Sequence, residues 1–175
     1  MTAPGSYWHQ CGAPSCTCRA KIAPIFNRGR LYTKRHEFCV AELAAAEREI
    51  TRIASAHRWL SDRGYDLFRP YRNNDRHSWL EFATDRAMLF HPMSLADFIR
   101  ARAWLEQWPK IRNFNPRGTS YGLKHVAGHT IGYTTNGVFI AAAISAGFRF
   151  QLLGSDARFN ISTLAWTHEQ RKVAA

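Results

Sequence analysis

The spacing of apolar and polar positions predicts that most of this chain is helical. Between residues 37 and 63, apolar side chains recur at alternating intervals of four and three residues, which is the pattern of an amphipathic helix. Gly64 is a suitable residue to end this helix. We expect the stripe either to cover the protein's own core or to pair with a second copy as a homodimeric coiled coil. The stripe consists of Cys39, Leu43, Ala46, Ile50, Ile53, His57 and Leu60.

Two further helices are predicted in the middle of the chain. Residues 78–90 place aromatic and apolar side chains on one helical face, and a β-hairpin of 65–71 with 77–83 is the competing interpretation. A helix over 94–108 is indicated by Ser94, which Asp97 follows three residues later as in a capping box. Pro109 ends it, and 110–118 then form a basic loop.

The last third of the chain predicts two short helices and a hairpin. Ser120 can cap a helix over 121–129, and Thr135 or Asn136 can cap one over 137–146, with Gly147 as its stop. Segments 148–153 and 158–163 are expected to be strands joined by a four-residue turn.

The predicted fold class is therefore α+β, mainly helical, with several helices and a C-terminal β-hairpin. Its last elements have the order of a winged helix, in which the third helix reads base edges in the major groove. The 137–146 helix carries almost no polar donors, however, so we expect it to be buried. The domain organisation expected is a basic, cysteine-containing arm (1–36), a helical core with the hairpin (37–163) and a tail (164–175).

The net charge of the chain says more about its binding partner than any other property of the composition. The chain has 24 Lys and Arg against 13 Asp and Glu, a net charge of +11, and an isoelectric point near 10.1. Arg outnumbers Lys by 19 to 5, and its planar fork of donors suits phosphate groups. So basic a balance favours a polyanionic partner.

Two stretches without any carboxylate hold the candidate contacts. The arm, residues 1–36, contains no acid, since the first one is Glu37. Its Pro and Gly residues interrupt any helical or strand periodicity, so we expect it to be irregular. Residues 107–155 contain no acid either. We predict that the cations of both stretches bind the phosphate backbone of a nucleic acid, and that Phe114 and Tyr121 stack on unpaired bases. These cations are Arg19, Lys21, Arg28, Arg30, Lys34 and Arg35 in the arm, and Lys110, Arg112, Arg117, Lys124 and Arg149 in the core.

The cysteines allow two interpretations. Cys11, Cys16, Cys18 and Cys39 could supply four thiolates to a structural zinc ion, with His9 or His36 as substitutes. They could instead remain free thiols, which the spacing favours, since no two form a clean C-x2-C pair. His125 and His129 share a helical face, but the Glu of the H-E-x-x-H motif is absent.

Composition excludes several classes of protein. Hydrophobic residues make up 46% and aromatic residues 13%, so the chain is not intrinsically disordered. No signal-peptide pattern or membrane-length apolar run is present, and we expect the protein to act in the cytoplasm, without membrane contact. No phosphate loop or nucleophile elbow is found, so we expect no enzyme. A ribonuclease using His125 and His129 is a third candidate.

Segments 119–125, 136–143, 147–148 and 159–162 resemble segments of small uncharacterised proteins of bacterial mobile elements, both phage and plasmid. The resemblance covers about the last third of the chain and carries no assigned activity. Small proteins of such elements often regulate transcription, process DNA or block host defences. This context implies an alternative function: an inhibitor that binds a protein of a host-defence nucleoprotein complex, in the manner of an anti-CRISPR or anti-restriction protein.

Overall fold

The computed structural model describes residues 8–10, 19–21, 25–27, 30–32, 38, 40–65, 76–162 and 164. The chain divides into two compact units, Met1–Ala45 and Ala46–Ala175. In the first, β1 (Trp8–Gln10) pairs antiparallel with β2 (Arg19–Lys21), and β3 (Ile25–Asn27) with β4 (Arg30–Tyr32). The expectation of an irregular arm was wrong for these residues. Antiparallel neighbours need only short connections, so breakers between strands are compatible with local pairing.

Helix α1 (Val40–Ala56) is shorter than predicted. The chain leaves the helix after Ala56 and forms a small antiparallel hairpin of β5 (Leu60–Ser61) and β6 (Gly64–Tyr65). Gly64 therefore lies in a strand, with φ at +119°, and does not end the helix. Ala46, Ile50 and Ile53 of the predicted stripe are buried in the protein's own core, so these positions are not free to form a coiled coil.

The middle of the chain is helical, as one of the two interpretations predicted. Helix α3 (Arg76–Ala87) continues into a short 3-10 helix, η1 (Met88–Phe90), and a hairpin of 65–71 with 77–83 is therefore excluded. Helix α4 (Pro92–Glu106) starts before the predicted Ser94. His91 caps it, since its Nδ1 accepts from the Met93 N–H at 3.3 Å. The capping box was wrong because Pro92 already fits the first turn of a helix.

The C-terminal helices lie close to their predicted positions. Helix α5 (Ser120–Ile131) is capped by Thr119, whose hydroxyl accepts from the Gly122 N–H at 3.2 Å. Ser120, the predicted cap, instead accepts from the Ala157 N–H at 3.0 Å. Helix α6 (Asn136–Ser145) begins after Thr135 as predicted.

The C-terminal hairpin is confirmed, but its turn is shorter than expected. Strand β7 (Phe150–Leu153) pairs antiparallel with β8 (Asp156–Phe159), with Leu153 opposite Asp156. Only Gly154 and Ser155 connect them, and Gly154 has φ at +64°. Gly is readily accommodated at such a φ, so the two-residue turn needs no strain.

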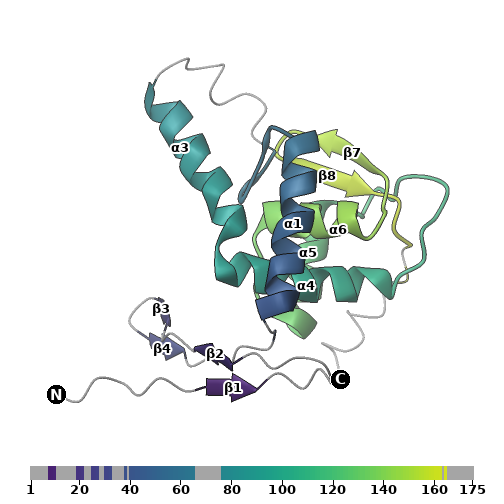
Figure 1. Cartoon of the computed structure of the whole chain (residues 1–175). Helices are drawn as coiled ribbons and strands as arrows, with labels where there is room; N and C mark the ends of the chain where they lie inside the picture. Colours follow the sequence, from purple (N-terminus) through teal and green to yellow (C-terminus); the bar gives the residue numbers. More distant parts are fainter. Residues whose placement is uncertain are drawn as a thin grey trace. The chain divides into compact units, whose positions relative to one another are not determined.

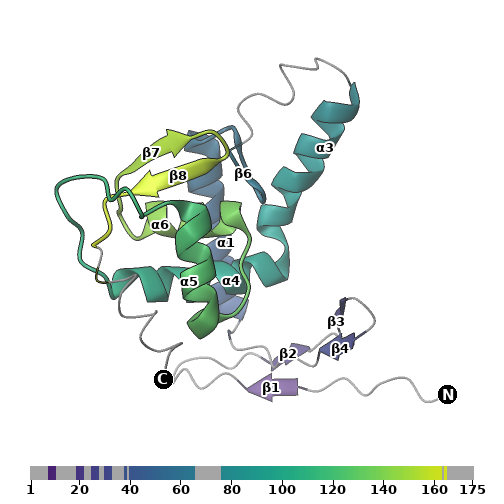
Figure 2. The same ribbon diagram turned by 180° about the vertical axis from the view of Figure 1, so that it is seen from behind.

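Helix α6 is the centre of the core. Figures 1 and 2 show α6 with α5 on one side and α1 on the other. Helix α4 packs along α6. Residues 136–143 are all buried. Trp104 of α4 contacts Phe139 of α6, with ring centroids 6.2 Å apart. The protein is therefore α+β and mainly helical, as predicted, and α6 has the burial expected of it. A helix so enclosed cannot enter a DNA groove.

None of the helices in the described ranges is both long and apolar enough to cross a membrane.

The partly buried ring of His57 is expected to make the stability of the core depend on pH. It lies edge-on to Tyr65 and Phe150, with centroids 6.0 and 5.4 Å away. Burial, with a smaller contribution from the charge of Arg52, lowers the pKa of His57 below its ordinary value. The unfolded chain then binds the proton more readily, so the free energy of unfolding should fall as pH drops through about 6.5 toward the lower pKa of the folded state.

Urea denaturation at about pH 7.5 and about pH 5.5 measures this dependence. We expect the wild-type protein to lose stability over the interval and His57→Phe, which keeps an aromatic ring, to lose less. An equal loss in both proteins would show that the pH dependence has another origin.

Candidate nucleic-acid interface

Asn160, buried after β8, fixes the start of the basic loop. Its backbone N–H donates to the Arg149 carbonyl at 3.2 Å, and its backbone carbonyl accepts from the Ile111 N–H at 2.8 Å. The side chain repeats the connection: Nδ2 donates to the Ile111 carbonyl at 2.9 Å, and Oδ1 accepts from the Arg149 N–H at 2.7 Å. One asparagine thus joins residue 111 to residue 149 through four hydrogen bonds.

A second buried asparagine, Asn115, fixes the far end of the same loop. Its Nδ2 donates to the Ile161 carbonyl at 3.1 Å and its Oδ1 accepts from the Arg117 N–H at 3.0 Å. Its backbone N–H donates to the Phe159 carbonyl at 3.0 Å. Because a loop anchored at both ends loses little further entropy on binding, its cations are preorganised for a ligand.

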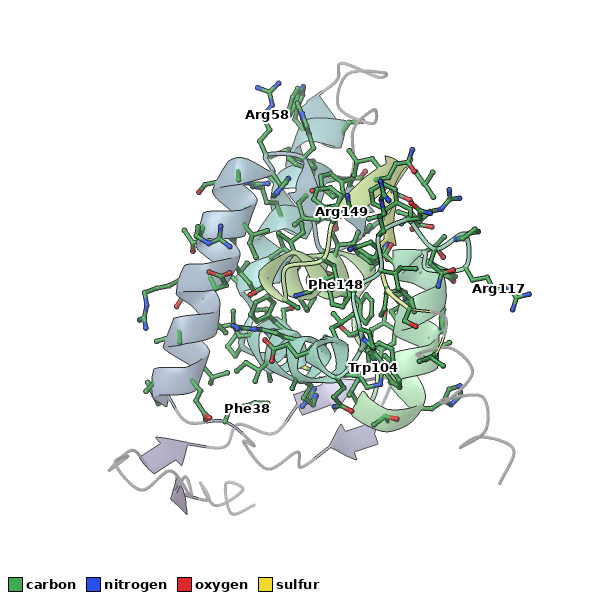
Figure 3. The ribbon with its side chains drawn as sticks, turned by 90° about the vertical axis from the view of Figure 1, so that its right-hand side faces the viewer. Phe38, Arg58, Trp104, Arg117, Phe148 and Arg149 are labelled. Carbon is green, nitrogen blue, oxygen red and sulfur yellow. The ribbon has the colours of Figure 1, made fainter. Side chains whose placement is uncertain are left out.

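Four exposed cations lie on the anchored loop and on the neighbouring segment that Asn160 joins to it. They are Lys110, Arg112, Arg117 and Arg149, and we call them the cationic surface. The Arg149 guanidinium donates to the Arg112 carbonyl and lies 5.7 Å from the Phe114 ring centroid. The Nζ atom of Lys110 lies 5.3 Å from the ring centroid of Phe148. Figure 3 shows Arg149 beside Phe148, and Arg117 pointing away from the body of the protein.

Among the described residues, the cations of the cationic surface form no ion pairs, whereas several cations of the helices do. On the helices, Arg52 pairs with Glu49 at 2.7 Å and Arg102 with Glu106 at 2.8 Å. Across the ranges that the structure describes, no salt bridge involves a residue of the cationic surface. The reason is the sequence itself, since 107–155 offer no local carboxylate. The four charges are therefore available to an external anion.

Lys124 does not belong to this surface. It is only 8% exposed, and its Nζ lies 4.9 Å from the Tyr121 ring centroid and 5.2 Å from that of Tyr133. Burial lowers the pKa of Lys124, and the charge of Asp156 acts in the opposite direction. Four of the five predicted core cations are thus exposed around one anchored loop, and the ammonium of the fifth lies close to two tyrosine rings.

The remaining predicted residues are not placed relative to this surface. Arg19 and Lys21 lie in β2 and Arg30 in β4, within the first unit. Of the possible zinc ligands, His9 lies in β1. The other possible ligands and the other arm cations lie outside the described residues, namely Cys11, Cys16, Cys18, Cys39, His36, Arg28, Lys34 and Arg35. Within the described part of the chain, no cluster of three metal-ligating side chains occurs. The zinc site stays a prediction.

Sequence reasoning missed three residues of this region. Nothing in the sequence indicated the roles of Asn115 and Asn160, because an asparagine whose buried side chain holds a loop by hydrogen bonds cannot be distinguished by sequence from any other loop asparagine. Tyr133 carried a weak signal, since it is an aromatic residue between Gly132 and two threonines, where no core element was predicted. His125, considered above for metal binding, lies edge-on to Tyr121, with ring centroids 4.6 Å apart.

Comparisons of the chain with protein-family models, with known curated proteins and with solved structures find no match.

Proposed function

We propose that this protein is a non-catalytic nucleic-acid-binding accessory or regulatory protein of the bacterial cytoplasm, and that the cationic surface contacts the phosphate backbone. One observation carries the proposal: four exposed cations lie on an anchored loop and on the segment beside it, and none of them has a carboxylate partner among the described residues. Three of them are arginines, whose guanidinium groups can bind phosphate through two parallel hydrogen bonds.

Burial of α6 makes backbone contact a better-supported mode than base readout. In a winged helix the third helix supplies the side chains that read bases, but here it is enclosed by the core. Cations on a loop can follow a phosphate chain of any sequence, so the proposed binding is independent of sequence.

The test is a salt series of binding to labelled DNA and RNA, each single- and double-stranded. If the four cations each neutralise one phosphate, log K should fall with log salt at a slope of about −3.6 on duplex DNA, or about −0.9 per phosphate. Arg112→Gln with Arg117→Gln should make that slope shallower by about 1.8.

The matched control is Arg48→Gln with Arg52→Gln, which removes the same charge from two exposed positions of α1. We expect the control to leave the slope close to that of the wild-type protein. An equal change in both double variants would mean that net charge alone drives binding, without a defined surface. Absence of binding to every nucleic acid at low salt would overturn the proposal and favour the alternative, an inhibitor that binds a host-defence protein.

A further inference from the structure

Two exposed tyrosines flank one buried lysine on the side of α5. Tyr133 is 73% exposed and Tyr121 is 54% exposed, which is unusual for large aromatic side chains. Lys124 Nζ lies within cation–π distance of both ring centroids, at 4.9 Å from Tyr121 and 5.2 Å from Tyr133. The ammonium therefore lies close to both rings, while most of the Tyr133 surface faces solvent.

The backbone holds Tyr133 in place from both directions. Gly132 ends α5 with φ at +82°, and its N–H donates to the Gly128 carbonyl at 3.1 Å. Thr134 is buried, and the hydroxyl of Thr135 donates to Asp62 Oδ1 at 2.7 Å. An aromatic ring in so short and fixed a connection presents a flat surface at little entropic cost on binding.

The ammonium of Lys124 has unused donors. It makes no hydrogen bond within the part of the chain that the structure describes, and Asp156 acts on it only through its charge. A partly buried ammonium without an acceptor is stabilised by one that a ligand brings, such as a phosphate oxygen or a base carbonyl. The site thus combines ring faces for stacking with a cation for an acceptor.

We propose that Tyr121, Lys124 and Tyr133 bind an unpaired nucleobase and its neighbouring phosphate, so that the preferred ligand class is single-stranded nucleic acid. This inference rests on the function proposed above and extends it, since α5 begins three residues after Arg117 of the cationic surface. A base in a duplex is already stacked on both faces and cannot offer one to Tyr133, whereas every base of a single strand can.

The experiment compares three probes of equal length, about a dozen nucleotides each: an oligothymidylate, an abasic strand with the same phosphates, and a duplex. The variants are Tyr133→Leu, which keeps apolar bulk without a ring, and Tyr133→Phe, which keeps the ring. We expect Tyr133→Leu to weaken oligothymidylate binding by about five- to a hundredfold with an unchanged salt slope. Binding of the abasic strand and the duplex should not change, and Tyr133→Phe should bind like the wild-type protein.

Each other outcome has a defined meaning. If Tyr133→Leu binds oligothymidylate as tightly as the wild-type protein while Arg112→Gln with Arg117→Gln still makes the salt slope shallower, the stacking site is refuted and backbone binding stands. If Tyr133→Leu weakens all three probes equally, Tyr133 supports the fold and stacks on no base. If the wild-type protein binds no probe, both proposals fail.

Discussion

Replacing Gly137 by alanine is expected to destabilise the protein by at least about 3 kcal/mol, close to the upper range for overpacked cores. Gly137 lies in the first turn of α6, and its N–H donates to the Asp62 carbonyl at 2.8 Å. A Cβ atom built there would lie 1.7 Å from the Ser61 carbonyl oxygen. That oxygen belongs to the backbone of β5 and cannot rotate away, so either the helix or the hairpin must move.

Gly128→Ala is the matched control for this substitution. Gly128 also lies within a helix, α5, but a Cβ atom there would meet no neighbouring atom within 4 Å. Alanine should therefore stabilise the protein by about 0.5–1 kcal/mol through its higher helix propensity. Guanidinium denaturation of both variants measures the contrast. A Gly137→Ala protein within about 1 kcal/mol of the wild type would refute the close approach of α6 to the β5–β6 hairpin.

The second large effect is expected at Arg86 of α3. Its guanidinium reaches the C-terminal end of α1 and donates to four backbone carbonyls, which are those of Ala54 (2.6 Å), His57 (3.4 Å), Arg58 (2.7 Å) and Leu60 (2.9 Å). Helix α1 has no basic residue in its own last turn. A cation from another helix therefore donates to carbonyls in the last turn of α1 and just beyond it, and interacts favourably with the helix dipole.

Arg86→Met should lower the free energy of unfolding by about 3 kcal/mol, because it removes the guanidinium donor from the partly buried carbonyls of Ala54 and Leu60. Arg86→Lys should recover only part of this loss, since an ammonium cannot span carbonyls from residue 54 to residue 60 as a planar fork does. The matched control is Arg102→Met, which removes an exposed ion pair with Glu106 and should cost no more than about 1 kcal/mol. Equal losses in Arg86→Met and Arg102→Met would contradict this role for Arg86.

The cationic surface shows how far sequence reasoning could locate a candidate site. The acid-free stretch from 107 to 155 already indicated which cations lack local carboxylate partners, because partners on a helix are usually three or four residues away. The sequence could not show that Arg149 lies beside Arg112. The two residues are brought together by the β7–β8 hairpin and by the hydrogen bonds between Asn160 and Ile111. Nor could the sequence show that the ammonium of Lys124 lies close to the rings of two tyrosines.

The amino-acid sequence by itself determined the helical class, the position of α6 and its burial, and the C-terminal hairpin. These features depend on local periodicity, caps and glycines, which act over a few residues. Tertiary contacts decided where α1 ends, because Ser61 and Asp62 contact Gly137, and Arg86 caps the helix from α3. They also decided which cations face solvent. Such contacts join residues tens of positions apart, and no local pattern records them.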